Sequence, residues 1–182
     1  MQKDMQNDNS QYSPAYEIED LIRQYGNDVL RIAYMYVKDI HTAEDIFQEV
    51  FIKVNNKLST FGGYSSIKTW IVRITINTCK DYLKSAYKRR VVPMMEYQED
   101  AIISDSDYEQ IEKQDTSDLI KKSVLSLPAK YKDVVICIYF QDMSIAEAAK
   151  ALNIAEGTVK SRLSRARSKL KNMLEGRVSD EF

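Results

Sequence analysis

Residues 143–173 constrain the fold most, because two helical patterns follow each other there with a short break. Ser144 followed by Glu147 predicts a capping box, in which each side chain satisfies a backbone donor at a helix start. Asn153 can adopt the left-handed conformation that ends a helix, and a second helix is expected to start near Thr158. The second helix has one apolar face, and basic and hydroxyl residues cover the rest. This arrangement predicts a helix-turn-helix.

The second helix of such a motif enters the major groove of DNA, where arginine can make two hydrogen bonds to guanine. Lysine, serine and threonine hold phosphates or single base edges. The alternative is a basic amphipathic helix that lies on a membrane or on an acidic partner. The alanine-rich first helix favours DNA, because small side chains suit the close packing of two short helices.

Composition indicates an all-α globular chain, since its 182 residues include five glycines, three prolines and few alternating β-branched runs. The net charge of −1 hides an uneven distribution. Residues 64–90 and residues 158–177 each hold seven basic residues against one acidic residue, whereas residues 91–118 hold nine acidic residues against one lysine. Two basic blocks around an acidic one predict two surfaces for a polyanion, joined by a linker that avoids it.

Metal and disulfide patterns are missing from the sequence. Cys79 and Cys137 are far apart, and His41 is the only histidine, so neither a zinc site nor a disulfide framework is expected. We expect both cysteines to pack as small hydrophobic residues, and we expect no cofactor. No apolar leader or membrane-spanning run is visible, which predicts a cytoplasmic protein.

Apolar residues at helical spacing predict three helices in the first half, over residues 16–37, 42–58 and 67–90. Residues 1–15 are polar and are expected to be disordered. The second helix also carries a polar stripe one turn apart, which is either a solvated acidic face or a docking surface. An isoleucine within the stripe favours docking, and a metal site is least supported because the stripe itself holds no histidine and no third acidic residue. The stripe consists of Asp45, Gln48, Glu49 and Ile52.

Residues 61–66 form a loop of small residues between aromatic ones, and Ser65 or Ser66 can cap the following helix. Glycine lets a ligand approach the backbone closely, so the loop beside a basic helix either holds an unstacked base or is an ordinary helix–helix turn. Trp70 is expected in the core. Further on, we predict an acidic linker over residues 91–116, a short helix over 118–127, Pro128 in the first turn of the next helix, and a frayed tail beyond 174. Five residues are expected to pack against the helix-turn-helix: Val134, Val135, Cys137, Ile138 and Tyr139.

Two long segments resemble the extracytoplasmic-function (ECF) sigma factors of bacterial RNA polymerase, which belong to the sigma-70 family. The chain resembles their region 2 over AEDIFQEVFIKVNNKLSTFGGYSSIKTWIVRITINTCKDYLKSAYKRR and their region 4 over LPAKYKDVVICIYFQDMSIAEAAKALNIAEGTVKSRLSRARSKLK. The resemblance implies two small helical domains, with region 2 over residues 16–90 and region 4 over residues 117–174. An acidic linker over residues 91–116 joins them and threads through the polymerase, and residues 175–182 form a tail.

The resemblance also implies roles for individual residues. The polar stripe, Asp45, Gln48, Glu49 and Ile52, would dock on the clamp coiled coil of the polymerase β′ subunit, and the β flap is a further expected contact. The −10 element, read as an unpaired strand with a flipped base, would be bound by Gly62, Gly63, Tyr64, Ser65, Ser66, Ile67, Asn77, Lys80, Lys84, Lys88, Arg89 and Arg90. The −35 element would be bound by Thr158, Lys160, Ser161, Arg162, Ser164 and Arg165.

The function implied is that of a sigma factor, which directs core polymerase to promoters in stress-responsive transcription under the control of an anti-sigma factor. Such a protein has no catalytic residue of its own and does not insert into the membrane. A stand-alone helix-turn-helix regulator is the alternative, and a nucleic-acid enzyme that uses the acidic stripe is a third hypothesis. Two basic blocks, a glycine loop and a docking stripe together favour the sigma factor. Lys160 and Ser164 differ from the side chains of some members, which leaves the −35 sequence open.

Overall fold

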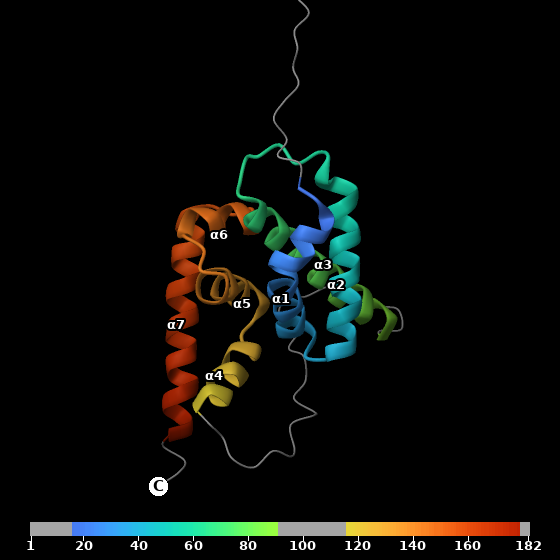
Figure 1. Ribbon diagram of the computed structural model, residues 1–182. Coiled ribbons are helices and arrows are strands. Elements are labelled where there is room, and N and C mark those ends of the chain that lie inside the picture. Colours follow the sequence, from blue (N-terminus) through green and yellow to red (C-terminus); the bar gives the residue numbers. More distant parts are fainter. Residues whose placement is uncertain (1–15, 91–115, 179–182) are drawn as a thin grey trace, which may run out of the picture.

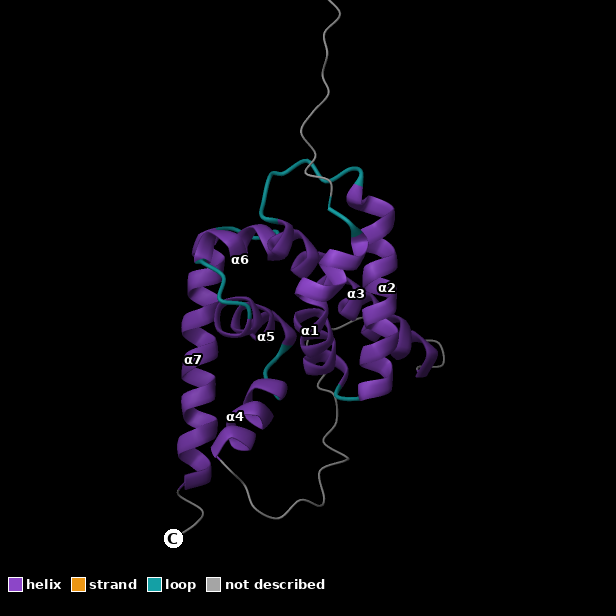
Figure 2. Ribbon diagram, viewed as in Figure 1, coloured by secondary structure: helices purple, strands orange, loops and turns teal. Residues whose placement is uncertain are grey.

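The computed structural model describes residues 16–90 and 116–178, and these residues form helices and short connections without any strand. The all-α prediction is therefore confirmed for this part of the chain (Figure 2). The expected disordered N-terminus, nearly all of the acidic linker and the last four residues lie outside the described residues. The elements are α1 (Ile18–Val37), α2 (Ile40–Leu58), α3 (Ile67–Arg90), α4 (Thr116–Leu125), α5 (Ala129–Val135), the π-helix η1 (Ile136–Phe140), α6 (Ile145–Leu152) and α7 (Glu156–Val178).

Helices α1 to α3 form an N-terminal bundle, and α4 to α7 form a C-terminal bundle beside it (Figure 1). The connection between α1 and α2 is short because Lys38 adopts a left-handed conformation with φ 59°. Asp39 then caps α2, and its carboxylate accepts a hydrogen bond from the Thr42 backbone N–H at 2.7 Å. The predicted start at Thr42 is wrong by two residues, because the acceptor comes from Asp39. The same hydrogen bond lowers the pKa of Asp39.

Helix α3 has buried side chains on two faces, whereas its sequence predicts only one apolar face. The predicted core residues Ile67, Ile71, Ile74 and Thr78 are buried, and the half-buried Trp70 packs on Phe61 with ring centroids 5.1 Å apart. The C-terminal bundle covers the opposite face of α3, mainly through α6. This contact explains a second buried set that periodicity did not predict: Thr69, Val72, Thr75, Ile76 and Cys79.

The C-terminal bundle differs from the predicted boundaries at several points. Helix α4 spans Thr116–Leu125, two residues earlier than expected, and Pro128 is the N-cap of α5, just before its first turn. Tyr139 packs against the helix-turn-helix as predicted, through Arg167 of α7, but its side chain is 49% exposed. Its hydroxyl accepts a hydrogen bond from Arg167 Nε at 2.7 Å, which places the contact with α7 at the surface. Helix α7 continues to Val178, beyond the predicted start of the frayed tail.

One continuous cluster of buried apolar side chains joins the two bundles. It includes Ile32 of α1, Ile76 of α3, Ile136 of η1 and Val159 of α7. Polar contacts also cross between the bundles, including a hydrogen bond from Lys68 Nζ to the Gln141 carbonyl at 2.8 Å. The structure therefore holds two helical units against each other, rather than separating them at the linker.

Lys132 lies in this contact and is only 8% exposed. Its Nζ donates to the Met35 carbonyl at 3.5 Å and lies 5.9 Å from the centre of the Tyr36 ring. Burial first, and then the positive charge of Lys38, lower the pKa of Lys132 from 10.5 to about 8. Above pH 8 the folded chain therefore holds fewer protons at this position than the unfolded chain does.

We expect this lysine to make the folded state more stable as the pH rises from 8 towards 10. Burial and Asp133 raise the pKa of Tyr36, so ionisation of this tyrosine in the unfolded chain opposes the trend above about pH 10. The wild type should gain about 1 to 2 kcal/mol over this range relative to Lys132→Met, which keeps an apolar stem without the titrating group. Thermal unfolding followed by circular dichroism from pH 7 to 10 measures the difference. A difference that does not change with pH would contradict the prediction.

Candidate nucleic-acid interface

The helix-turn-helix predicted from the sequence is present in α6 and α7. Ser144 Oγ accepts from the Glu147 backbone N–H at 3.2 Å, and the Glu147 carboxylate accepts from the Ser144 backbone N–H at 2.9 Å. These hydrogen bonds confirm the capping box and lower the pKa of Glu147. Asn153 ends α6 with φ 55° and ψ 48°, as expected. Helix α7 begins at Glu156, earlier than predicted, because the Ala155 carbonyl already accepts from the backbone N–H groups of residues 158 and 159.

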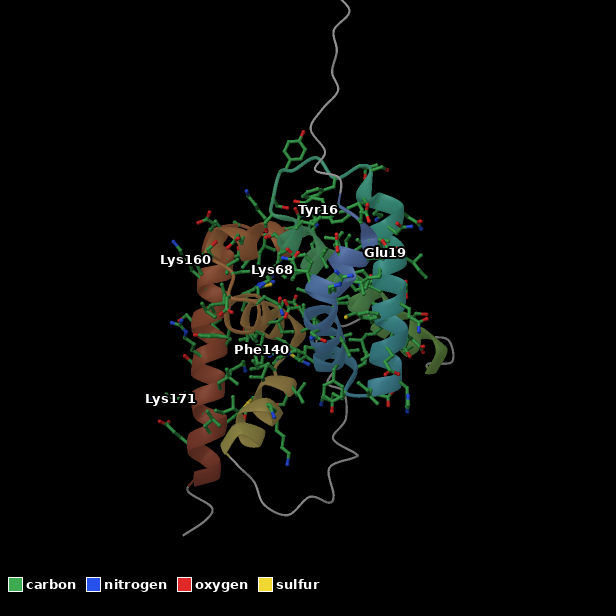
Figure 3. All side chains as sticks on the ribbon, in the orientation of Figure 1. Tyr16, Glu19, Lys68, Phe140, Lys160 and Lys171 are labelled. Carbon is green, nitrogen blue, oxygen red and sulfur yellow. The ribbon has the colours of Figure 1, made fainter. Side chains whose placement is uncertain are left out.

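The predicted recognition residues lie on the outer face of α7. Val159, Leu163 and Ala166 are buried and fix the rotation of the helix on its bundle. Lys160 and Lys171 project from the outer side of α7, away from the N-terminal bundle (Figure 3). Among the predicted −35 contacts, Lys160, Ser161, Ser164 and Arg165 are exposed, whereas Thr158 and Arg162 are half-buried.

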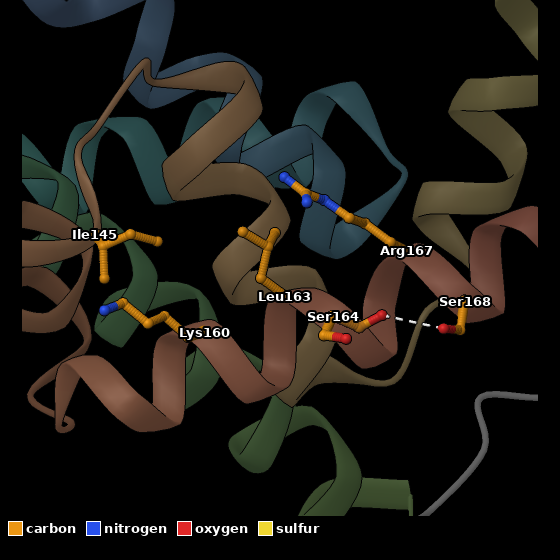
Figure 4. A pocket seen from close by; sticks show the side chains of 6 residues that line it. All are labelled: Ile145, Lys160, Leu163, Ser164, Arg167 and Ser168. Atoms are coloured by element: carbon orange, nitrogen blue, oxygen red, sulfur yellow. Dashed lines mark hydrogen bonds between the residues drawn. The ribbon is translucent and has the colours of Figure 1, made fainter.

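A shallow groove runs along the same face of α7 (Figure 4). Arg167 turns away from the groove centre because its guanidinium binds the Tyr139 hydroxyl and lies 5.7 Å from the centre of that ring. Both Arg165 and Arg167 are exposed, but Arg167 is held by Tyr139 of its own chain. The residues that line the groove are Ile145, Lys160, Leu163, Ser164, Arg167 and Ser168.

The glycine loop lies between α2 and α3. Gly63 has φ +69°, which favours glycine, whereas a Cβ at Gly62 would lie 2.7 Å from the exposed Tyr64 ring and would require only that ring to move. The Tyr64 side chain is 91% exposed, and Ser66 caps α3 by accepting from the Thr69 backbone N–H at 3.1 Å. Ser65 is half-buried. Ile67 is buried in the core, so its side chain does not line a pocket for a base.

The predicted phosphate contacts on α3 are in different surroundings. Asn77 and Lys84 are exposed, and Asn77 lies about 15 Å along α3 from the loop, at about 1.5 Å per residue. Lys80 is only partly exposed, and its Nζ lies 2.5 Å from the Asp133 carboxylate of the C-terminal bundle. The side chains of Lys88, Arg89 and Arg90 lie outside the described residues.

The predicted docking stripe is exposed on α2. Asp45, Gln48 and Glu49 are exposed, and so is Ile52, whose side chain is 60% accessible. Glu49 pairs with Lys53 on the next turn of the helix at 2.6 Å. Helices α2 and α7 lie on opposite sides of the molecule (Figure 1). The stripe and the recognition face therefore belong to helices on opposite sides of the molecule.

The loop and the helix-turn-helix meet, which the sequence did not predict. Lys150 Nζ of α6 donates to the Tyr64 carbonyl at 3.3 Å. Asp133 of α5 accepts hydrogen bonds from Tyr36 Oη and Lys80 Nζ, both in the N-terminal bundle. Tyr36 and Asp133 are 97 positions apart in the sequence, so no local pattern links them.

The cysteines pack as predicted, since both are buried and unpaired. Burial raises the pKa of Cys79 and of Cys137 to about 12. Within residues 16–90 and 116–178, no cluster of three or more metal-binding side chains is found. Over the same residues, none of the helices has the length and apolar character required to cross a membrane.

Two family models match the chain, Sigma-70 region 2 over residues 21–89 and Sigma-70, region 4 over residues 117–170. The RNA polymerase sigma factor YlaC of Bacillus subtilis is 31% identical over 170 residues, which cover 91% of this chain and 96% of that protein. The ECF RNA polymerase sigma factor SigW of the same organism is 29% identical over 172 residues, covering 85% of this chain and 87% of that protein.

Two solved structures share the fold. CnrH in complex with the cytosolic domain of CnrY has a TM-score of 0.62 at 18% identity, covering 87% of this chain and 88% of that chain. The sigma factor RpoE in complex with the anti-sigma factor NepR, from Bartonella quintana, has a TM-score of 0.64 at 24% identity. This second match covers 86% of this chain and 98% of that chain.

Proposed function

Because this chain belongs to the sigma-70 family, as an ECF sigma factor that acts in transcription initiation with RNA polymerase, we propose which of its surfaces bind the polymerase and which bind promoter DNA. Residues 16–90 form the unit that binds core polymerase and the −10 element, and residues 117–174 form the unit that binds the −35 element. The observation that carries this proposal is the exposure of an acidic stripe on α2 and a basic face on α7 within one chain. A promoter-specificity subunit needs both surfaces.

The outer face of α7 binds the −35 element as duplex DNA. Arg165 is exposed and suits a bidentate contact to guanine, and Lys160, Ser161 and Ser164 suit phosphates or single base edges. Thr158 and Arg162 are half-buried, so they project less from α7 than the exposed residues do, and they suit contacts with the DNA backbone. The capping box and the left-handed Asn153 support this role, because they fix α6 at the start of α7.

The loop between α2 and α3 binds the −10 element as an unpaired strand. Opening a duplex costs about 1–2 kcal/mol per base-pair step, and a protein offsets part of this cost by binding extruded bases. Tyr64 is an exposed aromatic side chain beside two glycines, which suits stacking against a base at close range. Lys80 and Lys84 on α3 hold phosphates of the same strand, which adds affinity that decreases with salt.

The stripe on α2 binds the clamp coiled coil of the β′ subunit, and the C-terminal bundle contacts the β flap. Asp45 and Glu49 supply the negative charge, and Ile52 adds exposed apolar surface. The polymerase performs the chemistry, so the chain itself is not an enzyme. We place it in the cytoplasm, where polymerase and chromosome are found. An anti-sigma factor is a further proposed partner, since the RpoE relative is described in complex with one.

The alternative function is a stand-alone helix-turn-helix regulator, which needs neither the stripe on α2 nor the loop with Tyr64. Run-off transcription with purified core polymerase, followed by mapping of start sites, separates the two functions. We expect defined start sites only when chain and core are both present, downstream of a shared pair of −35 and −10 sequences. Specific binding of the chain alone to a duplex site, without any initiation on adding core, would favour the regulator.

A further inference from the structure

A buried carboxylate joins the two bundles and holds a residue that is proposed to bind DNA. Asp133 of α5 is 3% exposed, and it accepts hydrogen bonds from Tyr36 Oη of α1 and Lys80 Nζ of α3. Lys80 is one of the proposed phosphate contacts. Carboxylate and phosphate oxygens bind lysine through the same charge-assisted hydrogen bond. Asp133 therefore occupies the place on Lys80 that a phosphate of DNA would take.

Further contacts engage the same side of the N-terminal bundle. Lys68 Nζ donates to the Gln141 carbonyl at 2.8 Å, and Lys150 Nζ donates to the Tyr64 carbonyl at 3.3 Å. The C-terminal bundle therefore lies against the loop and against α3, both of which belong to the proposed −10 surface. An incoming DNA strand would have to replace these contacts.

The packed arrangement is too small to bind both promoter elements at once. The positions −35 and −10 are separated by about 25 base pairs, or about 85 Å at about 3.4 Å per base pair. A compact chain of this length has a radius of gyration of about 16 Å. Because the loop and α6 are in contact, the bundles must separate before the chain can bind the two elements together.

Two buried groups make the contact between the bundles less stable than an apolar contact would be. Gln141 is 2% exposed, and in the described part of the chain neither its amide oxygen nor its amide nitrogen has a hydrogen-bond partner. A buried polar group without a partner costs free energy that solvation recovers when the group is exposed. Lys132 is buried in the same contact. Both groups favour separation, which lowers the work that a partner must do.

We propose that Asp133 substitutes for a DNA phosphate on Lys80 and, together with Tyr36, fastens the free chain in a closed form that binds DNA weakly. Core polymerase opens this form by binding the two bundles at separate places. The DNA role of Lys80 and the identity of the opening partner rest on the proposed function. The closed form itself is a property of the free chain and is measured without polymerase.

The first test uses the two native cysteines as reporters. Cys79 of α3 and Cys137 of η1 both belong to the buried cluster that joins the two bundles. Both thiols are buried in the closed form, so they react with a thiol reagent only as fast as the bundles separate or open locally. In Asp133→Asn the amide keeps the shape and an acceptor for Tyr36 but loses the charge that holds Lys80. We expect labelling at pH 8 about 10-fold faster than in the wild type.

The second test measures binding of the free chain to a fluorescent 30-nucleotide single strand of mixed sequence. Phosphate contacts do not depend on sequence, so no promoter needs to be known. Asp81→Asn is the matched control, because Asp81 is exposed, adjoins Lys80 and gives the same change in net charge. We expect Asp133→Asn to bind the strand about 5-fold more tightly than Asp81→Asn does.

Tyr36→Phe provides a variant that keeps the net charge and removes one hydroxyl, and we expect labelling about 3-fold faster than in the wild type. If circular dichroism shows that Asp133→Asn does not fold, the labelling rate of Tyr36→Phe tests the closed form instead. Labelling at the wild-type rate in the folded variants would overturn the closed form. Faster labelling with DNA binding equal to that of Asp81→Asn would overturn the phosphate role of Asp133. A wild type that labels slowly yet never initiates with core would overturn the proposed function alone.

Discussion

The double variant Asp45→Lys/Glu49→Lys is expected to bind core polymerase roughly 100-fold more weakly than the wild type, a loss of about 3 kcal/mol. Both carboxylates are exposed on α2, so their replacement leaves the core intact, although the pair between Glu49 and Lys53 is lost. Such an exposed pair on one helix is worth only about 0.3–0.5 kcal/mol. The larger loss of binding free energy arises because the two new lysines would repel a polymerase surface that is complementary to negative charge. Titration of labelled chain with core polymerase at about 0.15 M salt measures it.

The matched control is Glu19→Lys/Asp20→Lys, which changes the net charge by the same amount on exposed residues of α1. We expect this control to bind core polymerase within about threefold of the wild type, since the loss of exposed charges far from a contact has a small effect. Equal binding by the two double variants would contradict docking through α2. The thermal unfolding midpoint of each variant confirms that the helices remain folded.

Arg165→Ala is expected to reduce transcription from a cognate promoter roughly 30-fold at limiting protein, which corresponds to about 2 kcal/mol. The reason is the loss of a bidentate contact to a base edge from an exposed arginine on α7. The loss should be restricted to promoters that carry the preferred base. On a promoter with that base changed, the variant and the wild type should therefore initiate equally. Run-off transcription on both templates measures the two ratios.

Lys171→Ala is the control for this prediction, because it removes one positive charge from the same helix and pairs only with Glu175 on the next turn in the described contacts. It should weaken transcription by the same small factor on both templates, as expected for the loss of general electrostatic attraction. If Arg165→Ala behaves like this control, Arg165 contacts the DNA backbone and does not read a base.

Local signals predicted the helices and the helix-turn-helix well. The capping box at Ser144, the left-handed Asn153 and the cap at Ser66 depend on residues within three or four positions, and all three are present. Boundaries were less accurate where a neighbouring residue offered a better acceptor, as Asp39 does for α2. The π-helix at Ile136–Phe140 was not predicted, because its composition does not distinguish it from an α-helix.

Contacts between distant segments could not be predicted from the sequence. Cys79, Thr75 and Ile76 are buried because the C-terminal bundle covers α3, and no periodicity within α3 contains that information. The same holds for Lys80, which the sequence indicates only as one basic residue among several. Its ion pair with Asp133 depends on the packing of α5 against α1 and α3. The candidate surfaces were therefore predictable one by one, whereas their mutual contact was not.

The π-helix between Asp133 and α6 sets the rotational phase of the DNA-reading unit. Its closing hydrogen bond runs from the Gln141 backbone N–H to the Ile136 carbonyl, five residues apart, instead of the four of an α-helix. A turn closed in this way accommodates one residue more than an α-helical turn does. Any further residue inserted here would add about 100°, so it would swing α6 and α7 around the helix axis by roughly a quarter of a turn. Asp133 would keep its position while the recognition helix pointed elsewhere. The length of this π-helix thus determines how the recognition helix is oriented relative to Asp133.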